Sequence, residues 1–88
     1  MDLKDKVTKA LQESLQPELI QLNDDDGVSG FVVAKRFQRM ATYDRQSMIY
    51  DLLRSSRVKL SKLELKRIVV IAALTPEEYA GMGVPLEG

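Results

Sequence analysis

The side chains of this chain that could do chemistry are mostly cations, and they are concentrated in its middle. Residues 31–70 hold ten lysines and arginines against three acids, whereas residues 1–30 hold three lysines against seven acids and the whole chain is neutral. Three of the cations, Lys35, Arg36 and Arg39, fall within five residues. Such a concentration is typical of a surface that binds an anionic partner, although solvated helix faces carry similar charge in small domains.

Two residue types that carry much of protein catalysis and metal binding are missing, because the chain has neither histidine nor cysteine. Most zinc sites, thiolate-ligated iron–sulfur sites, Cys–His nucleophiles and Ser–His–Asp triads therefore cannot be built from these residues. The acidic run 24–26 does not match an EF-hand calcium loop, which would place Leu22 at its first ligand position. We expect no metal, no cofactor and no enzymatic activity.

Hydrophobic periodicity predicts a helix at the start of the chain and two strands after it. Leucine and valine recur every fourth residue over 3–15, as on one face of a helix, and Pro17 ends that helix. The short apolar runs 18–23 and 31–34 predict strands. The turn-forming residues 24–30 between them predict a hairpin loop.

The second half of the chain repeats the passage from strand to helix. Apolar residues at positions 48, 49, 52 and 53 predict a second helix, which Thr42 is placed to cap and in which Tyr50 is expected to serve packing. The spacing of Ser and Glu in 61–64 predicts a short helical turn that starts with a capping box. The unbroken apolar run 68–74 predicts a strand in the middle of the sheet, and 75–78 begins a last helix.

These elements predict an α+β fold, because a hairpin supplies an antiparallel pair and a strand–helix–strand connection supplies a parallel one. The fold is a three-stranded mixed sheet with helices packed mainly on one face, in the order α-β-β-α-(short turn)-β-α. Eighty-eight residues fit one domain, to which we assign 1–81, with 82–88 as a flexible C-terminal tail. No signal-peptide core or membrane-length apolar run is present, so we expect a cytoplasmic protein without a membrane partner.

The order of elements and two stretches, residues 32–53 and 68–79, resemble the BolA-like proteins, which have a class II KH-like fold. The resemblance covers about residues 3–80. It fits best at Phe37, Arg45, Ile49 with Tyr50, Leu53 and Thr75–Glu78. It implies the family fold and a non-enzymatic adaptor role, in which a monothiol glutaredoxin-like partner is bound in the context of iron–sulfur trafficking and stress response.

The departures from the family pattern concern its histidines. They fall on Gly30, Gln46 and Arg67, and the family glycine two residues after the phenylalanine is Arg39. In the family, the last of these histidines reaches a cluster shared with the glutaredoxin, and arginine cannot replace it because a permanent cation has no free lone pair. The resemblance therefore implies a partner-binding surface without cluster ligands. Its residues are Arg45, Gln46, Arg67 and Thr75.

The alternative is a KH-like nucleic-acid-binding transcriptional regulator that uses the basic 35–67 region. Its cations would contact phosphates and give salt-dependent binding. They are Lys35, Arg36, Arg39, Arg54, Arg57, Lys59, Lys62 and Lys66. Phe37 and Tyr43 are the stacking candidates near the basic turn, and Phe37 is expected in the core. For either function we expect a monomer or a weak homodimer.

Overall fold

The computed structural model describes residues 2–81, so the predicted tail 82–88 lies outside the described residues. The elements follow the predicted order, with a 3-10 turn (η1) added after the second strand. They are α1 (Leu3–Leu15), β1 (Leu19–Asp24), β2 (Val28–Val33), η1 (Lys35–Phe37), α2 (Thr42–Ser55), α3 (Lys62–Lys66), β3 (Ile68–Leu74) and α4 (Pro76–Gly81).

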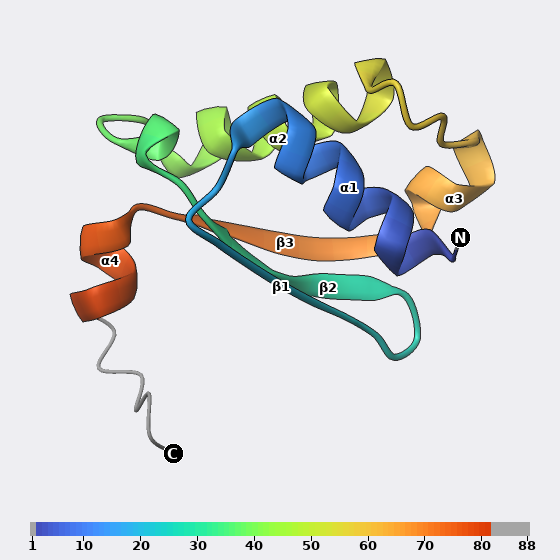
Figure 1. Ribbon diagram of the computed structural model, residues 1–88, viewed down its shortest axis with the longest axis horizontal. Helices are drawn as coiled ribbons and strands as arrows, with labels where there is room; N and C mark the ends of the chain where they lie inside the picture. The colour runs from blue at the N-terminus through green and yellow to red at the C-terminus, as the bar shows by residue number, and fades with distance from the viewer. Residues whose placement is uncertain (1, 82–88) are drawn as a thin grey trace.

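The strands form one mixed sheet in the order β1-β2-β3, with β1 antiparallel to β2 and β2 parallel to β3. Helices α1 and α2 cover one face of this sheet, and α4 lies toward the other face at one end (Figure 1). Tyr79 of α4 stacks on Phe31 with ring centroids 5.5 Å apart. Phe31 alternates with the buried Val32, so its ring is on the face away from α1 and α2. The predicted α+β fold is confirmed.

The prediction that the strand at 68–74 occupies the middle of the sheet was wrong, because β2 is central and β3 is an edge strand. Ile71 and Ala73 of β3 are buried, as the apolar run led us to expect. A register shift makes Val69 an extra residue opposite β2, and Val69 and Val70 are 64% and 55% exposed. Continuous apolarity therefore did not mark a strand covered on both faces.

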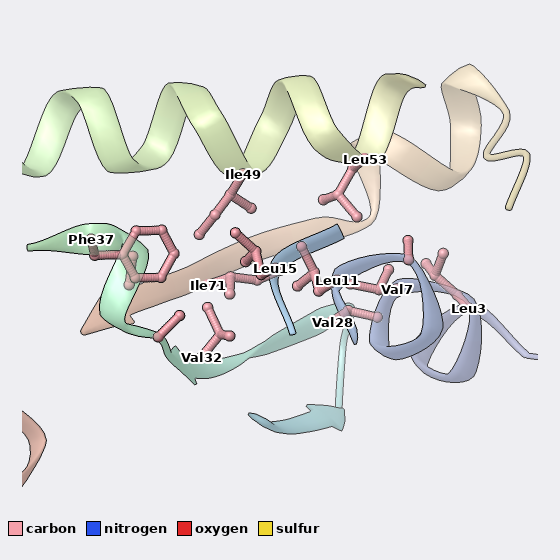
Figure 2. Close-up of a cluster of buried hydrophobic side chains, with 13 residues drawn as sticks. Leu3, Val7, Leu11, Leu15, Val28, Val32, Phe37, Ile49, Leu53 and Ile71 are labelled. Atoms are coloured by element: carbon pink, nitrogen blue, oxygen red, sulfur yellow. The ribbon is translucent and has the colours of Figure 1, made fainter. Parts of the chain in front are cut away.

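The hydrophobic core lies between the sheet and the two long helices. Figure 2 shows Leu3, Val7, Leu11 and Leu15 of α1, Ile49 and Leu53 of α2, Val28 and Val32 of β2, and Ile71 of β3 converging on this space. Phe37 of η1 fills one end of it and is fully buried, as predicted. Each such large side chain contributes about 1.5–3 kcal/mol when it leaves water, so this layer is the main source of stability.

Two local predictions needed correction. Thr42 does not cap α2: the N-cap is Ala41, whose carbonyl accepts from the Arg45 amide at 3.0 Å, and no side chain caps it. The chain enters the helix one residue earlier than predicted, which puts Thr42 inside the first turn. The hairpin loop is also shorter than predicted, since β2 begins at Val28.

The shorter hairpin depends on a glycine in the central strand. Gly30 has φ of +149°, and an added Cβ would lie 2.1 Å from the carbonyl oxygen of Gln21 on β1. No side chain fits into that space, so β1 and β2 pair through this position only because it is glycine. The residue acts as part of the sheet and not as part of the predicted loop.

Candidate functional site

A dense set of polar contacts surrounds Arg45 in the first turn of α2. Its Nε donates to the Met40 carbonyl at 2.9 Å, and its Nη1 donates to the Ala73 carbonyl at 3.0 Å. Both terminal nitrogens also hold the Glu78 carboxylate, at 2.6 and 3.1 Å. The arginine side chain is only 11% exposed. We call Arg45 with these three partners the arginine clasp, and it joins α2, β3 and α4.

Glu78 also takes part in capping the start of α4. Its carboxylate accepts from the Thr75 amide at 2.9 Å, and the Thr75 hydroxyl accepts from the Glu78 amide at 3.1 Å, which together form a capping box. The hydrogen bond from Arg45, followed by that from the Thr75 amide, lowers the pKa of Glu78 to about 2. The carboxylate is therefore ionised over the whole physiological range, and Thr75 is buried beside it.

Gln46 extends the clasp along β3. Its Nε2 donates to the Ile71 carbonyl at 2.9 Å, next to the Ala73 carbonyl that Arg45 holds. An unpaired strand edge attracts further strands, and proteins often cover such edges. The first turn of α2 covers this part of the β3 edge, so two of the predicted partner-binding residues make contacts within the chain.

The predicted partner-binding set is divided between two places. Arg45, Gln46 and Thr75 lie together at the C-terminal part of β3. Arg67 lies at the other end of that strand, is 62% exposed and has its Nη2 3.8 Å from Asp24. Seven strand residues span about 23 Å, which separates Arg67 from the clasp. Binding of a partner by any of the four stays a prediction.

The solvent side of α2 carries a stripe that sequence reasoning missed. Tyr43, Ser47, Tyr50 and Arg54 follow each other at helical spacing opposite the buried Ile49 side. Tyr43 is 79% exposed and Tyr50 is 47% exposed. We call these four residues the tyrosine face. The guanidinium of Arg54 lies 5.8 Å from the centre of the Tyr50 ring, within cation–π range.

We expected the Tyr50 side chain to pack within the protein, but nearly half of its surface is exposed to solvent. Beside it, a shallow depression of about 400 Å³ is lined by Gln46, Ser47, Tyr50 and Asp51. The signal in the sequence was the seven-residue interval between the tyrosines. That interval is two helical turns, about 10 Å, and it places both rings on one side.

The cations of the proposed nucleic-acid region are spread over both ends of α2. Lys35, Arg36 and Arg39 lie around η1, at one end of α2, whereas Arg57 and the cations after it follow the other end (Figure 1). The fourteen residues of α2 separate the backbones of the two groups by about 20 Å, but Ser14, which Arg36 reaches, lines the same depression as Arg57. Lys35 is 3.8 Å from Glu18, and Arg36 donates to the Ser14 carbonyl at 3.1 Å.

Other kinds of site find little support within residues 2–81. No group of three or more Asp or Glu side chains there is arranged to hold a metal ion. The acids with a lowered pKa are Glu78 and Glu64, and a hydrogen bond from Lys6 is the main cause for Glu64. None of the helices described has the length and apolarity that crossing a membrane requires.

Comparison with known proteins decides which fold this is. No family model and no curated protein match the sequence. Among solved structures, a bol-like protein from Babesia bovis matches with a TM-score of 0.66 and 21% identity, over 93% of this chain and 94% of that one. The BolA domain of SufE1 from Arabidopsis thaliana reaches 0.69, and BolA1 from the same plant 0.66, each at 21% identity over 89% of this chain and 96% of the other. This chain has a BolA-like fold.

One departure from the BolA-like pattern, the arginine at position 39, lies in a turn with left-handed backbone. Arg39 stands where the resemblance expects glycine, and its φ is +65°, in the left-handed region. The turn that follows Phe37 is closed by a hydrogen bond from the Met40 amide to the Phe37 carbonyl at 3.2 Å. A side chain in this region costs free energy that glycine avoids.

Proposed function

We propose that this protein is a non-enzymatic adaptor that binds a protein partner through the tyrosine face of α2. The observation that carries the proposal is the exposure of two tyrosines, Tyr43 and Tyr50, on one stripe of one helix. Tyrosine and arginine are enriched in protein interfaces and at their energetic hot spots. A tyrosine ring offers a large contact area with little side-chain entropy to lose.

The packing and hydrogen bonds that hold α2 on the sheet favour binding of a partner without rearrangement of this helix. Ile49 and Leu53 anchor the opposite side of α2 in the core, and Arg45 and Gln46 fasten its first turn to β3. A rigid helix presents its side chains in fixed positions, which reduces the ordering cost of association. The depression beside Tyr50 offers room for a side chain of the partner.

A monothiol glutaredoxin-like protein is the first candidate partner, because of the resemblance to the BolA-like proteins. If an iron–sulfur cluster is involved, the partner has to supply its ligands, since this chain contains neither histidine nor cysteine. The adaptor would then act by docking alone. Lys35 and Arg36 already have partners within the chain, Glu18 and the Ser14 carbonyl, which favours this function over a nucleic-acid groove.

Affinity measurements on single variants test the proposal. We expect Tyr50→Ala to weaken binding of a monothiol glutaredoxin about tenfold or more, and Tyr43→Ala to weaken it less, because Tyr50 borders the depression. Lys9→Ala, an exposed change on α1, serves as the matched control and should bind normally. Circular dichroism would verify that each variant is folded.

Normal binding by both tyrosine variants would contradict the proposed surface. An oligonucleotide at two salt concentrations serves as the competing ligand. If it binds and the glutaredoxin does not, and if that binding falls steeply with salt, the adaptor function is wrong and the nucleic-acid alternative is favoured.

A further inference from the structure

One end of the molecule carries an acidic and a basic segment side by side. The acidic tip consists of Asp24, Asp25 and Asp26 in the β1–β2 hairpin. The basic loop consists of Arg57, Lys59, Lys62 and Lys66, between the end of α2 and the end of α3. Figure 1 shows the hairpin, α3 and the end of α2 at the same end of the long axis.

Contacts within the chain show that the hairpin lies against the residues that follow the basic loop. The Val28 amide donates to the Arg67 carbonyl at 2.9 Å, which joins the hairpin to the residue that follows α3. Arg67 also approaches Asp24, at 3.8 Å. An added Cβ on Gly27 would lie 2.8 Å from Cγ2 of Val69, so Val69 lies directly against the hairpin turn.

Most of these charges have no opposite charge beside them. Over residues 2–81, no ion pair involves Asp25, Asp26 or any of the four cations of the basic loop, and all six are exposed; Arg57 shares a depression with Glu13. Glu64, the one acid between Arg57 and Arg67, is already held by Lys6 at 2.7 Å. The basic loop therefore keeps its positive charge, and most of the tip keeps its negative charge.

Apolar side chains lie between and beside the two charged segments. Leu63 of α3 is 75% exposed, in the middle of the basic loop. Val69 and Val70, at the start of the edge strand β3, are 64% and 55% exposed next to the hairpin. Exposed aliphatic residues flanked by complementary charges are typical of a surface that another protein covers.

We propose that this end binds a second copy of the same chain in a two-fold symmetric dimer. A two-fold axis between the segments sets the acidic tip of each copy against the basic loop of the other, so every charge contact occurs twice. Leu63 and Val69 of both copies then lie near the axis. A second copy fits better than an unrelated anion because the same surface already contains the complementary acids.

The two-fold arrangement is favoured over an open head-to-tail chain by the position of the segments. Tip and loop occupy one end of the molecule, so a single interface satisfies both of them and closes the assembly. Tyr43 and Tyr50 lie on the outer side of α2, seven or more residues before the basic loop, whereas Arg54 is close to that loop. The dimer would therefore leave the tyrosines of both copies free, and its existence does not depend on the adaptor function.

Exposed ion pairs are weak and screened by salt, which makes the dimer salt-sensitive. The screening length falls from about 10 Å at about 0.1 M salt to about 3 Å at about 1 M. We expect the dimer dissociation constant of the wild-type chain to rise about tenfold over this range. Sedimentation velocity over a series of protein concentrations measures it.

Charge exchange gives the decisive test. The tip variant combines Asp25→Lys with Asp26→Asn, so that a positive tip faces the positive loop of the other copy. Asparagine is used at position 26 because the backbone φ there is +56°, a conformation that asparagine adopts readily. The loop variant, Lys59→Glu with Lys62→Glu, places negative charge against negative charge. Each variant alone should be monomeric at concentrations where the wild type is dimeric.

Mixing the two variants in equal amounts should restore the dimer. In the mixed dimer, the altered tip meets the altered loop and the native tip meets the native loop, so both contacts are attractive again. The matched control, Lys9→Glu with Lys35→Glu, changes the net charge as much as the loop variant but lies on other exposed surfaces. It should dimerise like the wild type.

Several results would overturn the proposal. They are a wild-type chain that stays monomeric at every concentration, variants that dimerise normally, or a mixture that stays monomeric. Species larger than a dimer would show a head-to-tail chain. Binding of an oligonucleotide to the basic loop without self-association would assign the loop to a nucleic acid. Circular dichroism of both variants separates lost folding from lost association, and restored association in the mixture does so independently.

Discussion

Replacing Arg45 with methionine should destabilise the fold strongly, because the arginine clasp joins α2, β3 and α4. Methionine keeps the aliphatic stem but removes the donors to the Met40 and Ala73 carbonyls. Each hydrogen bond from a charged donor contributes about 1.5–3 kcal/mol net, and water can partly replace it where the site is open. We therefore expect a loss of about 2–4 kcal/mol from the free energy of unfolding, without counting the exposed pair with Glu78.

Urea denaturation followed by circular dichroism measures this loss. A domain of this size is stable by roughly 5–10 kcal/mol, so the variant should still fold in water. With a slope of about 1–1.5 kcal/mol per M urea, the unfolding midpoint should fall by about 1.3–4 M. Lys9→Met, an exposed change on α1, is the control and should leave the midpoint within about 0.5 M.

The reasoning is refuted if the Arg45→Met midpoint stays close to the wild-type value. If the variant is also fully folded and loses partner binding, Arg45 acts as a docking residue, as the resemblance implied. If it is destabilised yet binds the partner normally at low urea, Arg45 is a structural residue only.

Three further predictions concern the backbone and the acid range. Replacing Arg39 with glycine should stabilise the fold by about 0.5–1 kcal/mol, since φ of +65° suits glycine; an unchanged or lower urea midpoint would contradict this. Replacing Gly30 with alanine should lower the free energy of unfolding by about 2–4 kcal/mol, because the new Cβ would lie 2.1 Å from the Gln21 carbonyl oxygen. A loss below about 1 kcal/mol in calorimetry would contradict the close approach of the two strands. Glu78 has its pKa lowered from 4.5 to about 2, so its ionised form stabilises the folded state above about pH 4.5, and this contribution is lost as pH falls toward about 2. Glu78→Gln should flatten that part of the stability profile, and an unchanged acid slope would show that Arg45 does not hold the carboxylate.

The elements with clear local signals could be predicted from the sequence. The four-residue recurrence in α1 corresponds to a fully buried stripe, and Asp2 caps that helix through the Asp5 amide. The capping box at Ser61 and Glu64 is formed as predicted. These features depend on residues a few positions apart, so spacing alone determines them.

Features that depend on distant contacts could not be predicted. β3 is an edge strand because β2 pairs with both other strands, and side chains of α2 bind the carbonyls on its free edge. The sequence gives no local sign of either. Likewise, the proximity of Arg45 to Glu78 joins residues thirty-three positions apart. Arg67, predicted to lie near Arg45, is at the other end of β3.

The tyrosine face could be predicted from the sequence in part. The interval between Tyr43 and Tyr50 is visible in the sequence, but their exposure depends on which side of α2 meets the sheet. The buried positions of that helix, Ile49 and Leu53, already define that side. A helical projection of α2 from the sequence would therefore have separated the tyrosines from the core.

A chemical-shift map of the labelled protein with a monothiol glutaredoxin tests the central claim most directly. The adaptor account predicts amide shifts concentrated over Tyr43–Arg54, with the largest changes near Tyr50 and the depression beside it. Shifts confined to the region around Arg67 and the basic loop, or no shifts at all, would contradict the claim that the tyrosine face of α2 binds the partner.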